Sequence, residues 1–216
     1  MIPSMRRKIN DLRRATSAAA GQLDKIERKK LQLPGSFFLG IHKILLAHNI
    51  KEAGKYRTAL HELKIEGKTF NPSEPWLIQA EILNLIEFIN NKRRWAPMYK
   101  KAFLKYVVNK PTKKIDRELT IKLFIAWYIH HKFVIIHPFT DGNGKMARLL
   151  MCLVLRFEHL SELTYPVMIN SIINKNKDKY LDALNAADGG NYVAGVNYLF
   201  QILNKAYKAT ARNLRQ

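Results

Sequence analysis

The segment His137-Pro138-Phe139-Thr140-Asp141-Gly142-Asn143-Gly144-Lys145-Met146-Ala147-Arg148 is the most informative part of this chain. Its two glycines flank Asn143 in a tight turn, and the turn opens a helix predicted from about Lys145 to Glu158. Small residues let backbone N–H groups approach an anion closely. The first turn of a helix adds exposed donors and the positive end of the helix dipole. The sequence therefore predicts an anion-binding turn here.

Four side chains around this turn favour a nucleotide over other anions. Lys145 and Arg148 are three positions apart, so they share one helix face and can both reach a polyphosphate. Asp141 is a hard oxygen ligand placed just before the turn, where a phosphate-bound Mg²⁺ would lie. His137 can take a proton near neutral pH. Together they predict a nucleotide site with the parts for phosphoryl or nucleotidyl transfer.

Three other interpretations compete with this one. Gly142-Asn143-Gly144 alone is typical of a plain turn at the start of a helix, and His137 alone would be a core histidine. With Ala147, the glycines also fit a dinucleotide-binding pattern after the strand-like run 133–136, but the chain lacks alternating strands and helices. A Walker A loop is excluded, because Phe139 stands where its first glycine is required.

The segment resembles the signature of Fic domains, His-x-Phe-x-Asp/Glu-Gly-Asn-Gly-Arg/Lys-x-x-Arg, and fills every fixed position. Two further segments are similar to this family: Ala53–Thr58, which leads into its flap, and Lys179–Gly190, beside its base pocket. The resemblance implies an all-α bundle with a small β-hairpin flap. It divides the chain into an N-terminal helical arm over 1–33, which resembles the family's inhibitory helix, and a Fic domain over 34–216.

The resemblance also implies a reaction, the transfer of AMP from ATP·Mg²⁺ to a Ser, Thr or Tyr hydroxyl of a target protein or of the chain itself. In that reaction His137 would be the general base, Phe139 the buried anchor of the loop and Asp141 the Mg²⁺ ligand. The phosphates would be bound by Gly142, Asn143, Gly144, Lys145 and Arg148. The flap, which would hold the target segment by main-chain pairing, would include Leu63, Ile65 and Phe70. The base pocket would include Tyr180, Leu181 and Asp188.

Two departures from the family pattern concern the nucleotide. Lys145 stands where arginine is commoner, and a lysine cannot make the bidentate fork of a guanidinium. Leu181 and Asp188 stand where relatives often have an aromatic residue and an Asn. An Asp accepts hydrogen bonds but does not donate them, so the identity of the nucleotide base stays open. Transfer of UMP, GMP, a phosphoryl group or phosphocholine by the same loop is therefore an alternative.

A third departure concerns regulation. Thr16-Ser17-Ala18-Ala19-Ala20-Gly21 is similar to the family's inhibitory motif Ser/Thr-x-x-x-Glu-Gly/Asn, with Ala20 at the glutamate position and Gly21 after it. In the family, that Glu pairs with the second arginine of the signature, which is Arg148 here. An unrelated alanine-rich helix is the alternative. The motif predicts a transferase released from autoinhibition, whether Ala20 is natural or introduced.

The rest of the chain fits a single helical domain. Of its 216 residues 47% are hydrophobic and 10% aromatic, enough for a real core, so a disordered chain is excluded. Apolar residues recur at helical spacing. The helices expected from this spacing cover 5–31, 36–49, 75–91, 115–131, 176–187 and 192–212, with a short strand pair within 55–72. The single Cys152 excludes a disulfide framework and is expected to be a core thiol.

The formal net charge of +20 predicts an anionic partner. As partners, ATP and a target protein are preferred over nucleic acid. A basic binding module with weak catalysis is the third alternative for the function. Assembly into a homo-oligomer stays open. A metal site at His130 and His131 lacks a carboxylate or Cys ligand, and Trp127 is expected to pack in the core. No apolar run reaches the roughly 18 residues of a membrane span. We expect a cytoplasmic location, with delivery into another cell left open.

Overall fold

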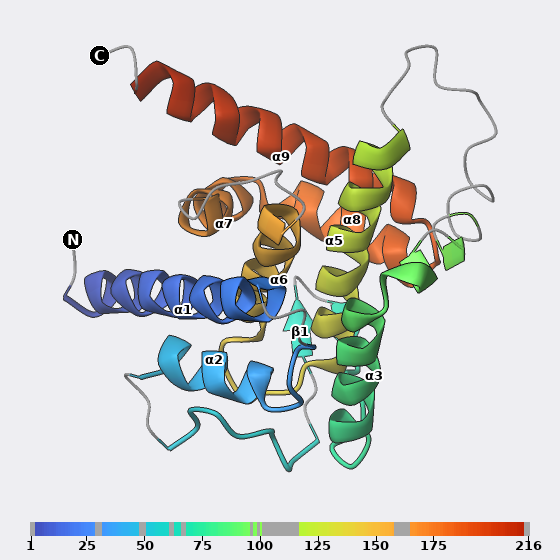
Figure 1. Cartoon of the computed structure of the whole chain (residues 1–216). Helices are drawn as coiled ribbons and strands as arrows, with labels where there is room; N and C mark the ends of the chain where they lie inside the picture. The colour runs from blue at the N-terminus through green and yellow to red at the C-terminus, as the bar shows by residue number, and fades with distance from the viewer. Residues whose placement is uncertain are drawn as a thin grey trace. The chain divides into compact units, whose positions relative to one another are not determined.

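The computed structural model describes residues 3–28, 32–47, 51–60, 63–65, 68–95, 97–98, 100, 117–157 and 165–213. These residues are mostly helical (Figure 1). The chain divides into two compact units, Met1–Asn91 with Lys132–Leu149, and Lys92–His131 with Leu150–Gln216. Each unit is described by itself.

The described elements follow the chain in a simple order. They are α1 (Pro3–Arg28), α2 (Phe37–Leu45), β1 (Leu63–Ile65), β2 (Lys68–Phe70), α3 (Ile78–Asn90), the 3-10 helix η1 (Lys92–Arg94), α5 (Arg117–Ile136), α6 (Asn143–Phe157), α7 (Tyr165–Lys175), α8 (Lys177–Asp188) and α9 (Tyr192–Asn213). The two strands pair antiparallel, with Leu63 opposite Phe70. Their side chains lie outside the described residues, so the role of Leu63, Ile65 and Phe70 as a flap stays a prediction.

One boundary differs clearly from the sequence prediction. The apolar run 133–136 was expected to be strand-like, with the preceding helix ending near His131, but α5 continues through it to Ile136. Val134, Ile135 and Ile136 are β-branched and favour strands locally. A strand also needs a partner strand for its backbone groups, and the continuing helix satisfies these groups internally.

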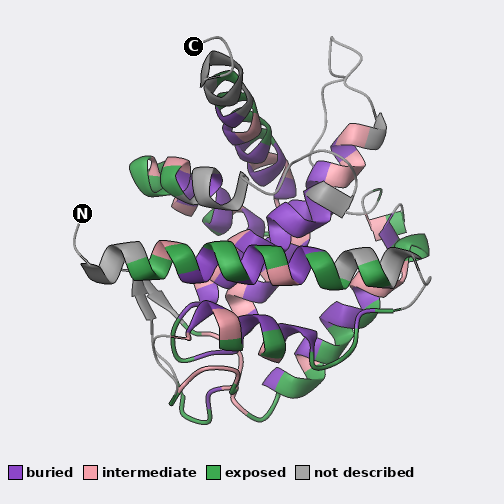
Figure 2. Ribbon diagram, turned by 60° about the vertical axis from the view of Figure 1, so that its left-hand side comes forward, coloured by how far each residue is buried: buried purple, intermediate pink, exposed green. Residues whose placement is uncertain are grey.

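In the first unit, α1 has a buried and an exposed face. Leu12, Ala15 and Ala19 are buried at spacings of three and four residues, whereas Arg7 and Arg13 are exposed. Figure 2 shows purple and green alternating along this helix. The buried face lies along α2 (Figure 1), so the arm expected from the sequence packs within the same compact unit as residues 132–149.

The core of the first unit is built on α2 and the end of α5. Phe38 and Ile41 of α2 are fully buried, and the Phe38 ring meets the Phe133 ring edge-on at 5.5 Å between centroids. Asn90 at the end of α3 holds the segment after α1, since its amide accepts the Leu33 N–H at 2.8 Å and donates to the Leu33 carbonyl at 3.2 Å. These contacts join α2 to the end of α5, and the segment after α1 to the end of α3.

The second unit is organised around the first part of α5. Every residue of Leu123–Ile129 except the half-buried Tyr128 is buried, as the apolar run predicts. The Trp127 ring packs edge-on against Tyr198 of α9, with 5.9 Å between centroids. Leu119–Ile136 is long and apolar enough to cross a membrane by length and composition, and 61% of it is buried within the protein.

Candidate functional site

His137 directly follows α5 and adopts an unusual backbone conformation. Its φ of +47° lies in the left-handed region, and its N–H still donates to the Phe133 carbonyl at 3.0 Å. Such a conformation costs a residue other than glycine roughly 1–3 kcal/mol. The ring Nδ1 lies 3.3 Å from the Val134 carbonyl. When Nδ1–H donates there, the ring carries its lone pair on Nε2, which is the atom that would accept a proton.

Phe139 and Asn143 lock the start of the loop together. Phe139 is fully buried, as an anchor must be. The Asn143 amide accepts the Phe139 N–H at 2.9 Å and donates to the Phe139 carbonyl at 2.6 Å. Both ends of this buried amide are therefore used inside the protein. The predicted phosphate contact of Asn143 is left to its backbone N–H, which at the start of α6 has no acceptor within the helix.

His42 of α2 supports this loop and was not among the residues predicted from the sequence. It is fully buried, and its ring stacks on Phe139 at 3.5 Å between centroids, with 3° between the planes. Its Nε2–H donates to the Asp141 carbonyl at 2.9 Å, and its Nδ1 accepts the Gly54 N–H at 3.0 Å. Burial lowers the pKa of His42, which favours the neutral ring that these two bonds require.

Gly142 stands where no other residue fits comfortably. Its φ is +83°, and a Cβ there would lie 3.3 Å from His42 Nε2. Its N–H donates to Asp141 Oδ1 at 2.6 Å, while the Asp141 side chain is exposed to solvent. Among the described residues, no group of three His, Cys, Asp or Glu side chains gathers to hold a metal. A single exposed carboxylate fits Mg²⁺ that arrives already bound to phosphates, but not a resident metal.

Gly144 brings the guanidinium of Arg148 to the start of α6. A Cβ on Gly144 would lie 3.2 Å from Arg148 Nη1, so the guanidinium lies against the helix's first turn. Arg148 Nε is buried and has no hydrogen-bond partner within the described part of the chain. A buried donor of this kind is costly to leave unpaired, so this position favours an acceptor such as a phosphate oxygen.

Lys145 belongs to the same group of charges. Burial lowers the pKa of Lys145 most, while the carboxylates of Asp141 and Asp11 raise it and the cations Lys8 and Arg148 lower it further. Both cations therefore lie close enough to disfavour a charged Lys145. An anion bound at the start of α6 would relieve this repulsion, so the electrostatics favour a phosphate here.

The residues of the predicted inhibitory motif lie on α1. Thr16 and Ala20 are buried, and the Thr16 hydroxyl donates to the Leu12 carbonyl at 2.8 Å. Gly21 is exposed, and a Cβ there would meet nothing within 4 Å. The position at which the family has its glutamate is thus buried, and Gly21 faces solvent.

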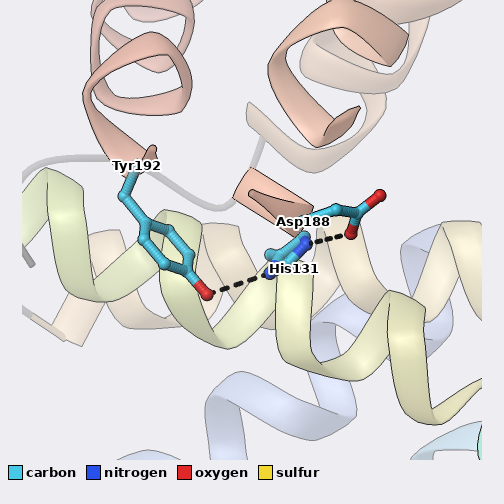
Figure 3. Close-up of polar contacts among 3 residues, drawn as sticks. All are labelled: His131, Asp188 and Tyr192. Atoms are coloured by element: carbon cyan, nitrogen blue, oxygen red, sulfur yellow. Dashed lines mark hydrogen bonds and ion pairs between the residues drawn. The ribbon is translucent and has the colours of Figure 1, made fainter. Parts of the chain in front are cut away.

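The predicted base-pocket residues belong to the second unit. Tyr180 is buried with its hydroxyl 3.2 Å from His130 Nε2, and Leu181 is half-buried. Asp188 Oδ1 accepts from His131 Nε2 at 2.8 Å, and the Tyr192 hydroxyl lies 3.2 Å from His131 Nδ1 (Figure 3). Because one oxygen of Asp188 is held by His131 and the side chain is 48% exposed, the carboxylate presents acceptors to solvent.

Comparisons with known proteins match the chain to one family. The Fic/DOC family model matches residues 32–155. The protein adenylyltransferase fic-1 of Caenorhabditis briggsae is 26% identical over 148 residues, covering 68% of this chain and 22% of that protein. A probable protein adenylyltransferase of Aquifex aeolicus is 26% identical over 132 residues, covering 61% of this chain and 31% of that protein. The matches thus cover about a fifth to a third of these relatives.

Solved structures of Fic proteins share the fold. A Fic family protein from Desulfovibrio desulfuricans superposes with a TM-score of 0.62 at 17% identity, covering 99% of this chain and 68% of that one. Fic-1 from Caenorhabditis elegans superposes with the same TM-score of 0.62 at 20% identity, covering 93% of this chain and 50% of that one. At these identities the likeness establishes the fold and nothing further.

Proposed function

The chain belongs to the Fic/DOC family, and from this premise we propose that it transfers AMP from ATP to a Ser, Thr or Tyr hydroxyl of a target protein. The observation that carries the proposal is the start of α6, where the Arg148 guanidinium lies against Gly144 beside a loop that His42 and Asn143 hold rigid. Relatives named protein adenylyltransferase support the reaction class. A cytoplasmic setting, which supplies ATP and proteins, belongs to the same proposal.

In the proposed reaction, the target hydroxyl oxygen bonds to the α-phosphorus of ATP. The bond between this phosphorus and the oxygen that bridges it to the β-phosphate breaks. The hydroxyl proton passes to His137 Nε2, and pyrophosphate leaves. The backbone N–H groups at the start of α6, with Lys145 and Arg148, bind the phosphates and offset charge in the transition state. Asp141 would hold Mg²⁺, which when bound to ATP neutralises phosphate charge.

Mass spectrometry of the purified protein and of a lysate, after incubation with ATP and Mg²⁺, tests this proposal. We expect an adduct with the mass of AMP on a hydroxyl residue, and we expect His137→Ala to abolish it while ATP binding persists. An adduct of unchanged yield in His137→Ala would remove His137 from the mechanism. No adduct in the wild type, on the chain or on any lysate protein, would refute AMP transfer.

The identity of the base needs its own test, because Asp188 presents acceptors to solvent. Guanine offers two neighbouring donors to a carboxylate, whereas adenine offers one donor beside an acceptor. A panel of labelled ATP, GTP, UTP and CTP, run with the wild type and with Asp188→Asn, identifies the donor. A donor preference that Asp188→Asn leaves unchanged would exclude Asp188 from base selection.

We also propose that the chain lacks the family's inhibitory contact, because alanine stands at position 20. Ala20→Glu should suppress auto-modification by placing a carboxylate where it can pair with Arg148 and compete with the triphosphate. Since Ala20 is buried, Ala20→Gln is the matched control: it has the same size without the charge and should suppress less. Equal suppression by Glu and Gln would show a packing defect and contradict the proposal.

A further inference from the structure

Arg57 is a buried arginine whose three side-chain nitrogens all donate to backbone carbonyls. The residue is only 4% exposed. Nε donates to the His137 carbonyl at 2.7 Å, Nη1 to the Ala59 carbonyl at 2.9 Å, and Nη2 to the carbonyls of Ser73 and, at 3.4 Å, Ile136. Burial lowers the pKa of Arg57, as expected for a charge removed from water. One guanidinium thus joins three separate chain segments.

These three segments have different places in the fold. Ala59 precedes β1 and Ser73 follows β2, so the guanidinium bonds to the chain on both sides of the strand pair. Ile136 and His137 lie at the C-terminal end of α5, where a cation is favourable because the last carbonyls have no partner in the helix. Two backbone bonds reinforce the join: the Arg57 N–H donates to the Pro138 carbonyl at 2.9 Å, and the Ser73 N–H to the Ile135 carbonyl at 3.2 Å.

The same bonds maintain the conformation of His137. Its left-handed φ of +47° costs free energy, so the surrounding contacts must hold it. Two successive carbonyls are held by Arg57: the His137 carbonyl accepts from its side chain, and the Pro138 carbonyl accepts from its backbone N–H. The direction of the His137 ring is thereby tied to Ala59 and Ser73, which lie on either side of the strand pair.

We propose that Arg57 is a positioning residue that sets the distance between His137 and a hydroxyl presented by the strand pair. The proposal rests on the transferase function proposed above, and it deepens that function by coupling the site of the target to the general base. Arg57 itself touches neither ATP nor the hydroxyl. The nucleotide loop is held separately by His42 and Asn143, so the loss of Arg57 should affect the acceptor more than the donor.

Arg57→Lys tests the proposal through the partition between two products. Attack of a protein hydroxyl on the α-phosphorus gives the AMP adduct, whereas attack of water gives free AMP, and both release pyrophosphate. Lysine keeps the charge but cannot bond to carbonyls in three directions. We expect the ratio of adduct to free AMP to fall roughly 10–100-fold, the scale of misplaced reacting groups, with an unchanged KM for ATP. Lys55→Gln, which removes an exposed cation of the same segment, should leave the ratio unchanged.

A second variant covers a failure of Arg57→Lys to fold, and a second measurement covers a loss of both products. Ser73→Pro removes the Ser73 N–H that bonds to Ile135 and should lower the same ratio. Hydrogen exchange needs no activity: in Arg57→Lys, the amides of His137 and Ser73 should exchange faster, while those of α3 do not. Proportional loss of both products in both variants, or unchanged exchange at His137 and Ser73, would overturn the positioning role. No product in the wild type would refute the transferase alone.

Discussion

The substitution Asn143→Ala tests whether the Asn143 side chain supports the loop or faces the nucleotide. Its amide makes two hydrogen bonds with the backbone of Phe139, which is fully buried. Alanine would leave one buried donor and one buried acceptor without partners, at about 1–3 kcal/mol each. We therefore expect the free energy of unfolding to fall by about 2–6 kcal/mol, with the lower values applying if water enters the gap.

Urea unfolding followed by circular dichroism measures this loss of unfolding free energy. An unchanged m-value shows that the wild type and the variant expose the same surface on unfolding, so that their free energies can be compared. Thr140→Ala is the matched control, because Thr140 is an exposed residue of the same loop, and it should change the stability by less than about 0.5 kcal/mol. Asn143→Asp should also be strongly destabilising, since it places an oxygen in place of the donor that faces the Phe139 carbonyl. A loss below about 1 kcal/mol in Asn143→Ala, with a large loss of ATP affinity, would refute the reasoning.

Three further outcomes follow from the geometry. Gly144→Ala should weaken ATP binding measured by calorimetry at unchanged stability, because a Cβ displaces the guanidinium lying 3.2 Å away; unchanged affinity would contradict this. Burial lowers the pKa of His42 from its ordinary value of 6.5, so the unfolded chain binds more protons just below pH 6.5. The stabilising contribution of His42 is therefore lost as pH falls from 6.5 through its folded pKa. His42→Gln should flatten that part of a stability–pH curve, and an identical curve would exclude the effect. Gly195→Ala would place a Cβ 1.8 Å from Trp127 Nε1 and should destabilise the second unit by about 1–3 kcal/mol, as measured by fluorescence-monitored unfolding. Gly189→Ala is the control and should not destabilise it, because a Cβ there would lie 3.5 Å from its nearest neighbour.

Most of the helices were predictable, because apolar residues at helical spacing mark the buried face of a helix. The helix α7 (Tyr165–Lys175) was not expected. The apolar run Leu123–Ile129 indicated a buried helix, and the structure buries it. The helix after the signature was expected from about Lys145 but begins at Asn143, since the Asn143 amide bonds back to Phe139 and fixes the first turn. The extension of α5 through 133–136 was not predictable, because strand propensity is a local preference that tertiary packing overrides.

The supporting residues of the site were harder to find than the signature. His42 and Arg57 bond to carbonyls of Asp141 and His137, which lie 99 and 80 residues further along the chain. Every residue has a carbonyl, so such a bond leaves no complementary side chain that a single sequence can reveal. The available signals were a histidine on the apolar face of the helix predicted over 36–49 and an arginine in Ala53–Thr58.

The left-handed backbone of His137 sets stability against chemistry at one position. Glycine adopts such a φ without the steric cost that a Cβ brings to every other residue, histidine included, so the residue proposed for proton transfer is not the one that the backbone prefers. We expect His137→Gly to unfold at a higher urea concentration than His137→Ala, because glycine has no Cβ to strain at this φ. The reverse order would show that the strain in alanine is smaller than the extra chain entropy that glycine loses on folding. Under the proposed function, the chain therefore carries backbone strain at position 137 that a glycine would relieve.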